Sequence, residues 1–429
     1  MKIDEGATNL NLKFENSSIL KMFSSKGLKA YFPKGIVAQS NEAASNNVII
    51  NATAGVALKN SNYYTNPLIE NEFVSLSSDE VVGYAPTGGI KPLREVWQKS
   101  LYEKNSLAKG KSFSLPMVTS GITNALYIAS HLFVDEGDVV IWGKPSWDNY
   151  DLINQQAKVV NYNLFDENGV FDIDSLTKSV EKIKNEKIVL LFNFPNNPTG
   201  YTPTTNQMNQ IKDVIYDLAE KGKKVVVIVD DAYWGLFHTK ECSKNSLFFY
   251  LADLHPNVLA IKCDGATKED YSWGLRIGFL TYSLKGATNE LYQALEEKTA
   301  AVIRALISSS SKVGQSLLLK ALTDNSYVEY KIELDKIIKT KYEKLLSLVN
   351  MKDKDPYLIP LNSNSGYFFT FYCPNGAHPL RELLLNEDKI GTVVVDDYYL
   401  RVAYSAVDQS MLETLISSIY KRSQQLWRS

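Results

Sequence analysis

The chain has 429 residues, more than one small core organises, so we expect two domains or one large α/β unit. Its formal net charge of -2 excludes a global basic field that would attract nucleic acid, and its 45% hydrophobic and 22% charged residues are typical of a soluble globular enzyme. The three cysteines and four histidines lack the spacing of metal ligands, so we expect reduced thiols and no metal site.

The N-terminal residues 1–18 have no apolar core and no cleavage signature, so we expect no signal peptide. The longest apolar runs, such as VVVIV at 225–229, are too short to span a membrane. The sequence therefore predicts a cytoplasmic protein that binds neither a membrane nor nucleic acid.

In the middle of the chain, short β-branched runs alternate with amphipathic stretches. A strand is predicted over 117–120, and it leads into a helix predicted over 122–133. Further strands are predicted over 138–142, 188–194, 224–230, 258–264 and 276–282. This alternation predicts a mostly parallel sheet covered by helices on both faces, in which ligands bind at the carboxyl ends of the strands.

The C-terminal part of the chain has a different pattern. The segment from Thr299 to Leu348 has apolar residues near helical spacing and predicts long helices. Beyond it, residues 365–373 and 392–405 predict strands of a smaller α+β unit, and residues 410–427 predict a closing amphipathic helix. We expect this smaller domain to combine the C-terminal third with an N-terminal portion.

Lys268 and Arg276 follow the strand predicted over 258–264. A desolvated amine at Lys268 would have a lowered pKa and could form an imine with an aldehyde. The Arg276 guanidinium would bind a phosphate dianion through paired hydrogen bonds. For Lys268 alone, a solvated lysine at the start of a loop is the simpler interpretation.

Three polar side chains follow two other predicted strands. The turn FPNNPTG at 194–200 would aim the Asn197 amide inward, where it would donate to a phenolate oxygen of a cofactor ring. The Asp230 carboxylate ends a buried strand and needs a positive partner, such as a protonated pyridine nitrogen. Tyr233 would donate to the ring oxygen. For residues 194–200 the alternative is an ordinary turn. For Asp230 and its neighbour Asp231 the alternatives are a surface turn or a pair of metal ligands.

A helix start and an aromatic residue complete the set. Gly121 lets the backbone approach closely, and the N–H groups of Ile122 and Thr123 would form an anion site at a helix N-terminus. Trp147 offers a face on which a pyridine ring would stack, although a core tryptophan is the default interpretation. Together, these elements supply a phosphate cradle, a stacking face, ring contacts and an imine-forming lysine.

From about Ile50 to Arg401, these motifs resemble the class I/II aminotransferases of the aspartate aminotransferase superfamily, which bind pyridoxal 5'-phosphate (PLP) in fold type I. The resemblance implies a large PLP-binding domain over 61–315, with a mostly parallel seven-stranded sheet flanked by helices. It implies a smaller α+β domain from 1–60 with 316–429. It also implies that Lys268 is the Schiff-base lysine, and that cofactor contacts come from Ile122, Thr123, Trp147, Asn197, Asp230, Tyr233 and Arg276.

More distant matches imply the substrate contacts and the assembly. On the family pattern, Tyr84 in GYAPTGGIKPLR (83–94) reaches across a homodimer interface to the partner's cofactor phosphate. Arg401 binds the substrate α-carboxylate, and Gly55 lies next to the substrate. Arg304 resembles the arginine that binds a distal carboxylate across the dimer, but a solvated arginine on a helix face is the alternative.

The sequence also departs from the family pattern. Gly265 stands where the family often has a phosphate-binding serine, bulkier residues follow Lys268, and residues 50–57 lack a common proline. About 45 residues precede the first match, and we expect them to form an arm over the partner subunit or a substrate lid.

The activity that the resemblance implies is a ping-pong transfer of the amino group of an L-amino acid, with an acidic or aromatic donor, to a 2-oxo acid. The alternatives are a PLP-dependent lyase or decarboxylase on the same fold, a PLP-sensing regulator with a DNA-binding module, and a non-catalytic binding protein. The N-terminal stretch is short for a DNA-binding module, and the presence of Lys268 and Asp230 argues against a non-catalytic protein.

Overall fold

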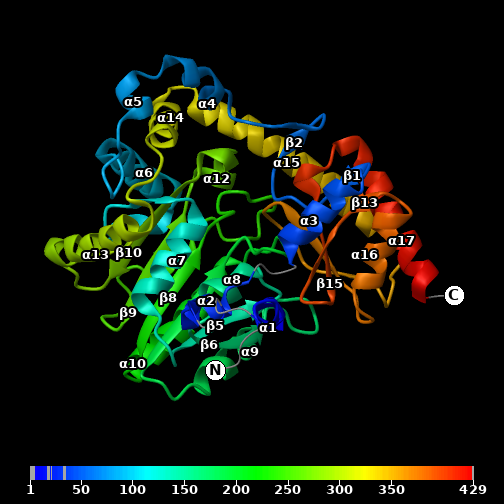
Figure 1. The fold of residues 1–429 in the computed structure, drawn as a ribbon, viewed down its shortest axis with the longest axis horizontal. Helices are drawn as coiled ribbons and strands as arrows, with labels where there is room; N and C mark the ends of the chain where they lie inside the picture. The colour runs from blue at the N-terminus through cyan, green and yellow to red at the C-terminus, as the bar shows by residue number, and fades with distance from the viewer. Residues whose placement is uncertain (1–4, 17–19, 21, 32–34, 428–429) are drawn as a thin grey trace.

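The computed structural model describes residues 5–16, 20, 22–31 and 35–427. Its centre is a seven-stranded sheet with the strand order β4-β10-β9-β8-β7-β5-β6 (Figure 1). The strands are β4 (Met117–Ser120), β5 (Val139–Lys144), β6 (Lys158–Asn163), β7 (Lys187–Asn193), β8 (Lys224–Asp230), β9 (Val258–Asp264) and β10 (Ile277–Leu284). Neighbouring strands from β6 to β9 pair in parallel, and only β10 runs antiparallel to its neighbours β9 and β4. The prediction of a mostly parallel sheet is confirmed.

Alternating side chains explain how this sheet is buried on both faces. Along β8, Val226 and Ile228 face one core, whereas Val225, Val227 and Val229 face the other. Strand β6 was not predicted, because it lies at the edge of the sheet and only Tyr162 is buried along it. Its apolar signal is therefore diluted by polar residues.

Helices cover both faces of the large sheet. Helices α7 (Ile122–Phe133) and α13 (Asn289–Ile307) contribute to one core, and α6 (Lys91–Lys104), α9 (Ile173–Glu181) and α10 (Thr205–Glu220) contribute to the other. The helix predicted over 122–133 is present with those bounds. Shorter helices in this part are α4 (Pro67–Glu72), α5 (Ser78–Val82), α8 (Asn149–Ile153), α11 (Leu247–Leu251) and α12 (Ala266–Glu269).

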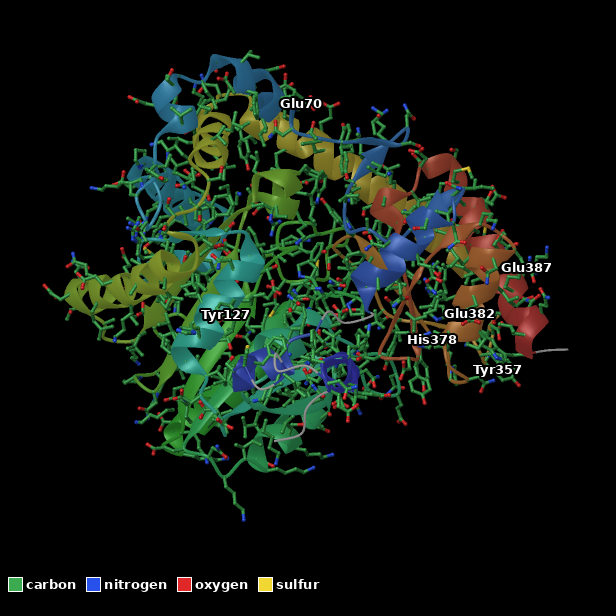
Figure 2. The ribbon with its side chains drawn as sticks, in the orientation of Figure 1. Glu70, Tyr127, Tyr357, His378, Glu382 and Glu387 are labelled. Atoms are coloured by element: carbon green, nitrogen blue, oxygen red, sulfur yellow. The ribbon has the colours of Figure 1, made fainter. Side chains whose placement is uncertain are left out.

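A smaller antiparallel sheet has the order β11-β12-β15-β14. Its strands are β11 (Ile359–Pro360), β12 (Phe368–Tyr372), β14 (Val393–Val395) and β15 (Tyr399–Ala403), and its helices are α16 (His378–Asn386) and α17 (Leu412–Trp427). The exposed side chains of Glu382 and Glu387 mark the outer surface of α16 and its C-terminal end (Figure 2). The predicted strands and closing helix of the C-terminal part are therefore present.

The N-terminal portion joins both parts of the fold. Strand β1 (Ile50–Asn51) pairs in parallel with β13 (Ile390–Gly391), and α3 (Ile36–Ser45) packs against β13 and β14. A hairpin of β2 (Leu58–Lys59) and β3 (Asn62–Tyr63) follows. By contrast, α1 (Glu5–Leu12) and α2 (Ser25–Lys29) lie beside the large sheet, where Gln155 Nε2 donates to the Lys29 carbonyl at 3.4 Å (Figure 1).

Two long helices lie between the part of the fold built on the seven-stranded sheet and the part built on the smaller sheet. Helix α14 (Lys312–Thr323) spans the predicted boundary at 315 and packs against α4, α5 and α6. Helix α15 (Tyr327–Asn350) runs from α14 to α17. The division into two domains stays a prediction, as does the role of the first 45 residues, of which 1–4, 17–19, 21 and 32–34 lie outside the described residues. Within the described residues, no helix has the length and hydropathy needed to cross a membrane.

Candidate active site

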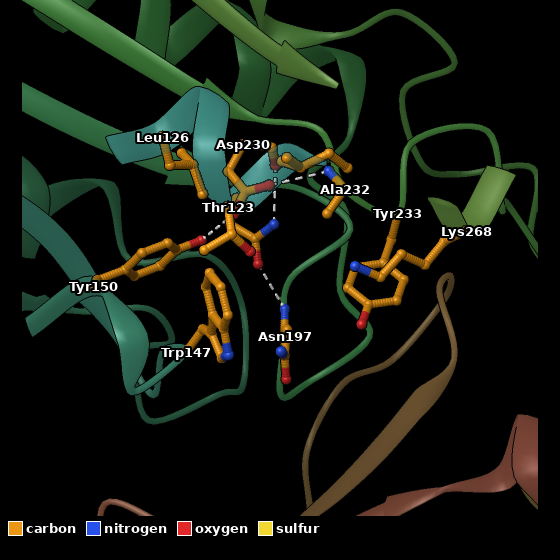
Figure 3. A pocket seen from close by; sticks show the side chains of 11 residues that line it. Thr123, Leu126, Trp147, Tyr150, Asn197, Asp230, Ala232, Tyr233 and Lys268 are labelled. Atoms are coloured by element: carbon orange, nitrogen blue, oxygen red, sulfur yellow. Dashed lines mark hydrogen bonds between the residues drawn. The ribbon is translucent and has the colours of Figure 1, made fainter. Parts of the chain in front are cut away.

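Many of the predicted site residues meet in a cavity of about 100 Å³ at the carboxyl ends of the central strands (Figure 3). Strands β5, β7, β8 and β9 each deliver one segment to it, and the N-terminus of α7 delivers another. The lining residues are Ile122, Thr123, Leu126, Trp147, Tyr150, Asn193, Asn197, Asp230, Ala232, Tyr233 and Lys268. Seven of these were predicted from the sequence; Leu126, Tyr150, Asn193 and Ala232 were not.

Lys268 directs its amine into the cavity from α12, four residues after β9 ends (Figure 3). Its Nζ lies 5.1 Å from the centroid of the Tyr233 ring, and no described residue accepts a hydrogen bond from it. Desolvation lowers the pKa of Lys268 to about 8; Asp230 partly opposes this shift, and Arg276 adds to it. An amine with a lowered pKa and no protein acceptor is suited to covalent attachment to an aldehyde, because a larger fraction of it is neutral than of an ordinary lysine.

The lowered pKa predicts how PLP attachment depends on pH. Only the neutral amine is a nucleophile, so the rate of covalent attachment should fall about tenfold per pH unit below the Lys268 pKa of about 8 and level off above it. Mixing apoprotein with PLP at a series of pH values and following the visible absorbance gives this profile. A midpoint near 10.5, the ordinary lysine value, would contradict the desolvated environment.

Asp230 is buried at the end of β8 and is held at both carboxylate oxygens. Tyr150 Oη donates to Oδ2 at 2.6 Å, and the Ala232 N–H donates to Oδ1 at 3.1 Å (Figure 3). Burial raises the pKa of Asp230, while Tyr150 and Lys268 oppose the shift. A protonated pyridine nitrogen would supply the opposite charge that this carboxylate needs. Tyr150 was not predicted, because its contact with Asp230 joins residues 80 positions apart and leaves no local pattern in the sequence.

Asn193 and Arg401 fix the orientation of Asn197. Asn193 Oδ1 accepts from the Asn197 N–H at 2.7 Å, and Asn193 Nδ2 donates to the Asp230 carbonyl at 2.9 Å. Arg401 Nη1 donates to Asn197 Oδ1 at 3.0 Å. Because the side-chain oxygen of Asn197 is occupied, its Nδ2 remains to donate to a ring oxygen, as predicted for this residue.

A second cavity, of about 290 Å³, adjoins the first and is called the outer cavity here. Trp147, Asn197, Tyr233 and Lys268 line both, and the outer cavity is also lined by Ile36, Val37, Ser40, Thr53, Ala54, Gly55, Phe368 and Arg401. A Cβ at Gly55 would lie 3.0 Å from both Tyr233 Oη and Phe368 Cζ, so a side chain there would crowd this wall.

Arg401 is almost fully buried beside the outer cavity. Its Nη2 donates to the Thr53 carbonyl at 2.7 Å, and its guanidinium lies 4.3 Å from the Phe368 ring centroid. Its Nε has no hydrogen-bond partner among the described residues. Desolvation lowers the pKa of Arg401 to about 10, so it still carries its charge at neutral pH. Burying this cation is costly unless an anion reaches it, which fits a substrate carboxylate.

The predicted phosphate cradle is assembled around Gly121, which has φ +79° at the N-cap of α7. A Cβ there would lie 2.3 Å from Arg276 Nη2, so the guanidinium lies across the helix start where Ile122 and Thr123 begin α7. The helix N-terminus and the guanidinium together form a site for a phosphate dianion.

Gly265 is explained by the same close packing. A Cβ at this position would lie 2.6 Å from the Ile277 carbonyl oxygen and 2.7 Å from Gly278 Cα. The serine that the family often carries here therefore does not fit without a backbone shift.

The residues present fit PLP. The free amine of Lys268 matches its aldehyde, the buried Asp230 carboxylate matches its pyridine nitrogen, and the cradle at Gly121 and Arg276 matches its phosphate. Two predicted residues lie elsewhere: Tyr84 is 95% exposed, and Arg304 is exposed on α13 and lines neither cavity. Both roles were expected only across a dimer and stay predictions.

Comparisons with known proteins show that the chain is similar to aminotransferases. The probable aspartate aminotransferase of Methanocaldococcus jannaschii is 27% identical over 202 residues, 47% of this chain and about half (49%) of the relative's length. The aspartate aminotransferase of Thermotoga maritima is 26% identical over 86% of this chain and 89% of its own. In fold, an aminotransferase from Anaerococcus prevotii matches with a TM-score of 0.83 at 21% identity, covering 94% of this chain and 99% of the other.

The sequence model of one protein family matches most of the chain. It is described as "Aminotransferase class I and II" and matches residues 53–419, which include the seven-stranded sheet, Gly121, Lys268 and Arg401. This match confirms the resemblance predicted from the motifs. The chain belongs to the class I and II aminotransferase family, whose members are PLP-dependent transaminases.

Proposed function

We propose that this transaminase binds PLP through Lys268 and transfers the amino group of an L-amino acid to a 2-oxo acid in two half-reactions at one site. The observation that carries the proposal is the pairing in one cavity of the Lys268 amine, which lacks a protein acceptor, with the buried Asp230 carboxylate. Bound PLP supplies the electron sink for the bond broken at the substrate Cα.

Lys268 moves the proton in this proposal. A general base works best when its pKa lies near the operating pH, and desolvation brings the pKa of Lys268 to about 8. Its Nζ would take the proton from the substrate Cα. The same Nζ would then donate it to the cofactor carbon that bears the amino group. Asp230 holds the proton on the pyridine nitrogen through its negative charge.

The remaining side chains position the reactants. Arg401 would bind the α-carboxylate through its guanidinium N–H groups, of which Nε has no partner among the described residues, and this would fix the direction of the Cα–H bond relative to Lys268. Trp147 lines both cavities and offers its face to the ring, while Asn197 Nδ2 and Tyr233 Oη donate to the ring oxygen. A lyase would use the same cofactor contacts, so the two activities are separated by their products.

We further propose a cytoplasmic homodimer with shared sites. The segment around α4 and α5 exposes large apolar side chains, namely Phe73, Val74, Val82 and Tyr84. Clustered exposure of this kind indicates an interface. The three cysteines are free and buried, which suits a reducing compartment.

An absorbance experiment on purified holoenzyme tests the function. A panel of L-amino acids is added one at a time, and the visible band of bound PLP is expected to convert to a near-ultraviolet band with at least one of them. Addition of a 2-oxo acid is expected to restore the visible band, with the new amino acid as the product. Irreversible conversion with release of carbon dioxide or a Cβ fragment would instead indicate a decarboxylase or lyase, and no conversion by any amino acid would exclude a transaminase.

A further inference from the structure

The outer cavity has one wall that the proposed chemistry leaves unassigned. With the α-carboxylate on Arg401 and the amine at Lys268, the substrate side chain would face α3, which contributes Ile36, Val37 and Ser40. Among the described residues that line this cavity, the cations are Arg401 and Lys268, and both already have a role. The α3 wall is thus apolar apart from one hydroxyl.

Helix α3 is fixed in this position by contacts to both parts of the fold. Gln39 exchanges two hydrogen bonds with Val394 of β14, donating to its carbonyl at 2.9 Å and accepting from its N–H at 2.7 Å. On the opposite side, Asp148 Oδ2 accepts from the Ile36 N–H at 3.0 Å. Because Asp148 follows Trp147 directly, this bond ties the start of α3 to the predicted stacking residue. The wall is therefore a built part of the site.

The charge behind this wall is negative. A third cavity, of about 170 Å³, is lined by Gly35 and Ile36 and also by three carboxylates: Asp148, Asp396 and Asp397. Asp396 pairs with Lys144 at 2.8 Å, so its charge is partly compensated, and Asp397 lies 3.1 Å from His378 Nε2. Asp148 instead takes the N-terminal position of α3, where a helix dipole attracts an anion. A distal substrate carboxylate would find that position occupied.

We infer that the amino donor carries a neutral, apolar side chain, aliphatic or aromatic, and that Ile36, Val37 and Asp148 select it against acidic side chains. This inference rests on the proposed function, since it assumes that Arg401 and Lys268 hold the carboxylate and the amine. Of the acidic and aromatic donor classes expected from the sequence, the structure favours the aromatic one and adds aliphatic donors.

Half-reaction kinetics of the full-length holoenzyme test the inference. The kcat/KM for conversion of the bound cofactor by leucine or phenylalanine is expected to exceed that for aspartate or glutamate by about tenfold or more, because an unpaired charge against an apolar wall is disfavoured. Equal or faster conversion by aspartate or glutamate would overturn the inference and leave the transaminase function intact. If no amino acid reacts, the proposed function itself fails.

Binding of unreactive analogues gives a readout that does not depend on turnover. The carboxylates 4-methylpentanoate and 3-phenylpropanoate carry the leucine and phenylalanine side chains without an amine, and succinate corresponds to aspartate. Titration calorimetry is expected to give dissociation constants about tenfold lower for the two monocarboxylates than for succinate. Tighter binding of succinate would show that a cation from elsewhere, such as the partner subunit, completes this wall.

A substitution in α3 tests whether this wall decides which amino donor the enzyme prefers. Val37 is 56% exposed and lines the outer cavity, so a longer side chain is accommodated there. Val37→Arg is expected to raise the kcat/KM ratio of aspartate to leucine about tenfold, whereas Val37→Gln, the matched neutral control, leaves the ratio within about twofold. An unchanged ratio in Val37→Arg would show that the substrate side chain does not face α3.

Discussion

Lys268→Ala is expected to lower kcat for transamination by about 10⁴-fold and to abolish the visible band of bound PLP. The substitution removes both the amine proposed to attach the cofactor and the base proposed to move the Cα proton, and general base catalysis alone contributes up to about 10⁴. Absorbance spectra and steady-state rates of the purified variant measure both effects. Retention of the visible band would show that another lysine holds PLP.

Lys341 provides a matched control lysine. Desolvation also lowers its pKa to about 8, but its Nζ donates to the Ser405 carbonyl at 2.9 Å and to the Leu58 carbonyl at 2.5 Å. Lys341→Met is therefore expected to keep the visible band, with any cost appearing in thermal stability. Loss of the band in both variants would show that Lys341 is also needed to maintain the cofactor site.

The Lys268→Ala chain also tests the shared site. In a mixed dimer with a Tyr84→Ala chain, one site keeps its own Lys268 and receives the partner's Tyr84. That site is expected to bind PLP as tightly as the unmodified enzyme, and Tyr84→Ala homodimers are expected to bind it more weakly, since a charged hydrogen bond to the phosphate is lost. If Tyr84 acts within its own subunit, or the chain is a monomer, the mixture restores no tight site.

The sequence was sufficient to predict the residues of the site that follow buried strands. Asp230, Lys268 and Asn197 each come at or shortly after the end of a short apolar run, and parallel strands bring such ends to one edge. The order of the motifs along the chain then matched a family. The position of Gly121 at the start of α7 could also be predicted, because these residues are adjacent in sequence, and phosphate binding there stays a prediction.

Contacts between distant segments could not be predicted in this way. Tyr150 and Asp230 are 80 residues apart, and Gln39 and Val394 are 355 apart, so neither pair leaves a local pattern. The role of α3 as a wall of the outer cavity depends on the second of these pairings. The glycine at 265 was recognised as a departure, but its cause, the nearby Ile277 carbonyl, is visible only in the fold.

Asp230→Asn is expected to lower kcat by about 10²- to 10³-fold and to weaken PLP binding. Removing one partner of a buried charge pair costs about 3–5 kcal/mol, and the pair that we propose here is the Asp230 carboxylate with the pyridinium nitrogen. Asparagine keeps the shape: its oxygen can accept from the Ala232 N–H while its Nδ2 donates to Tyr150 Oη, so the change is mainly one of charge. Steady-state kinetics and a PLP titration of the apoprotein measure the two losses.

Thermal unfolding of the apoprotein distinguishes the proposed catalytic role of Asp230 from a structural one. Burial raises the pKa of Asp230 above its unfolded value, so its ionised form destabilises the fold at every pH above that value. Asp230→Asn removes this cost, and the Tm of the apoprotein at neutral pH is expected to stay equal or rise while activity falls. A lower Tm together with full activity would assign Asp230 to stability alone.

Tyr150→Phe keeps the charge of Asp230 and removes the hydroxyl that donates to it. This variant is expected to lower kcat by only about tenfold.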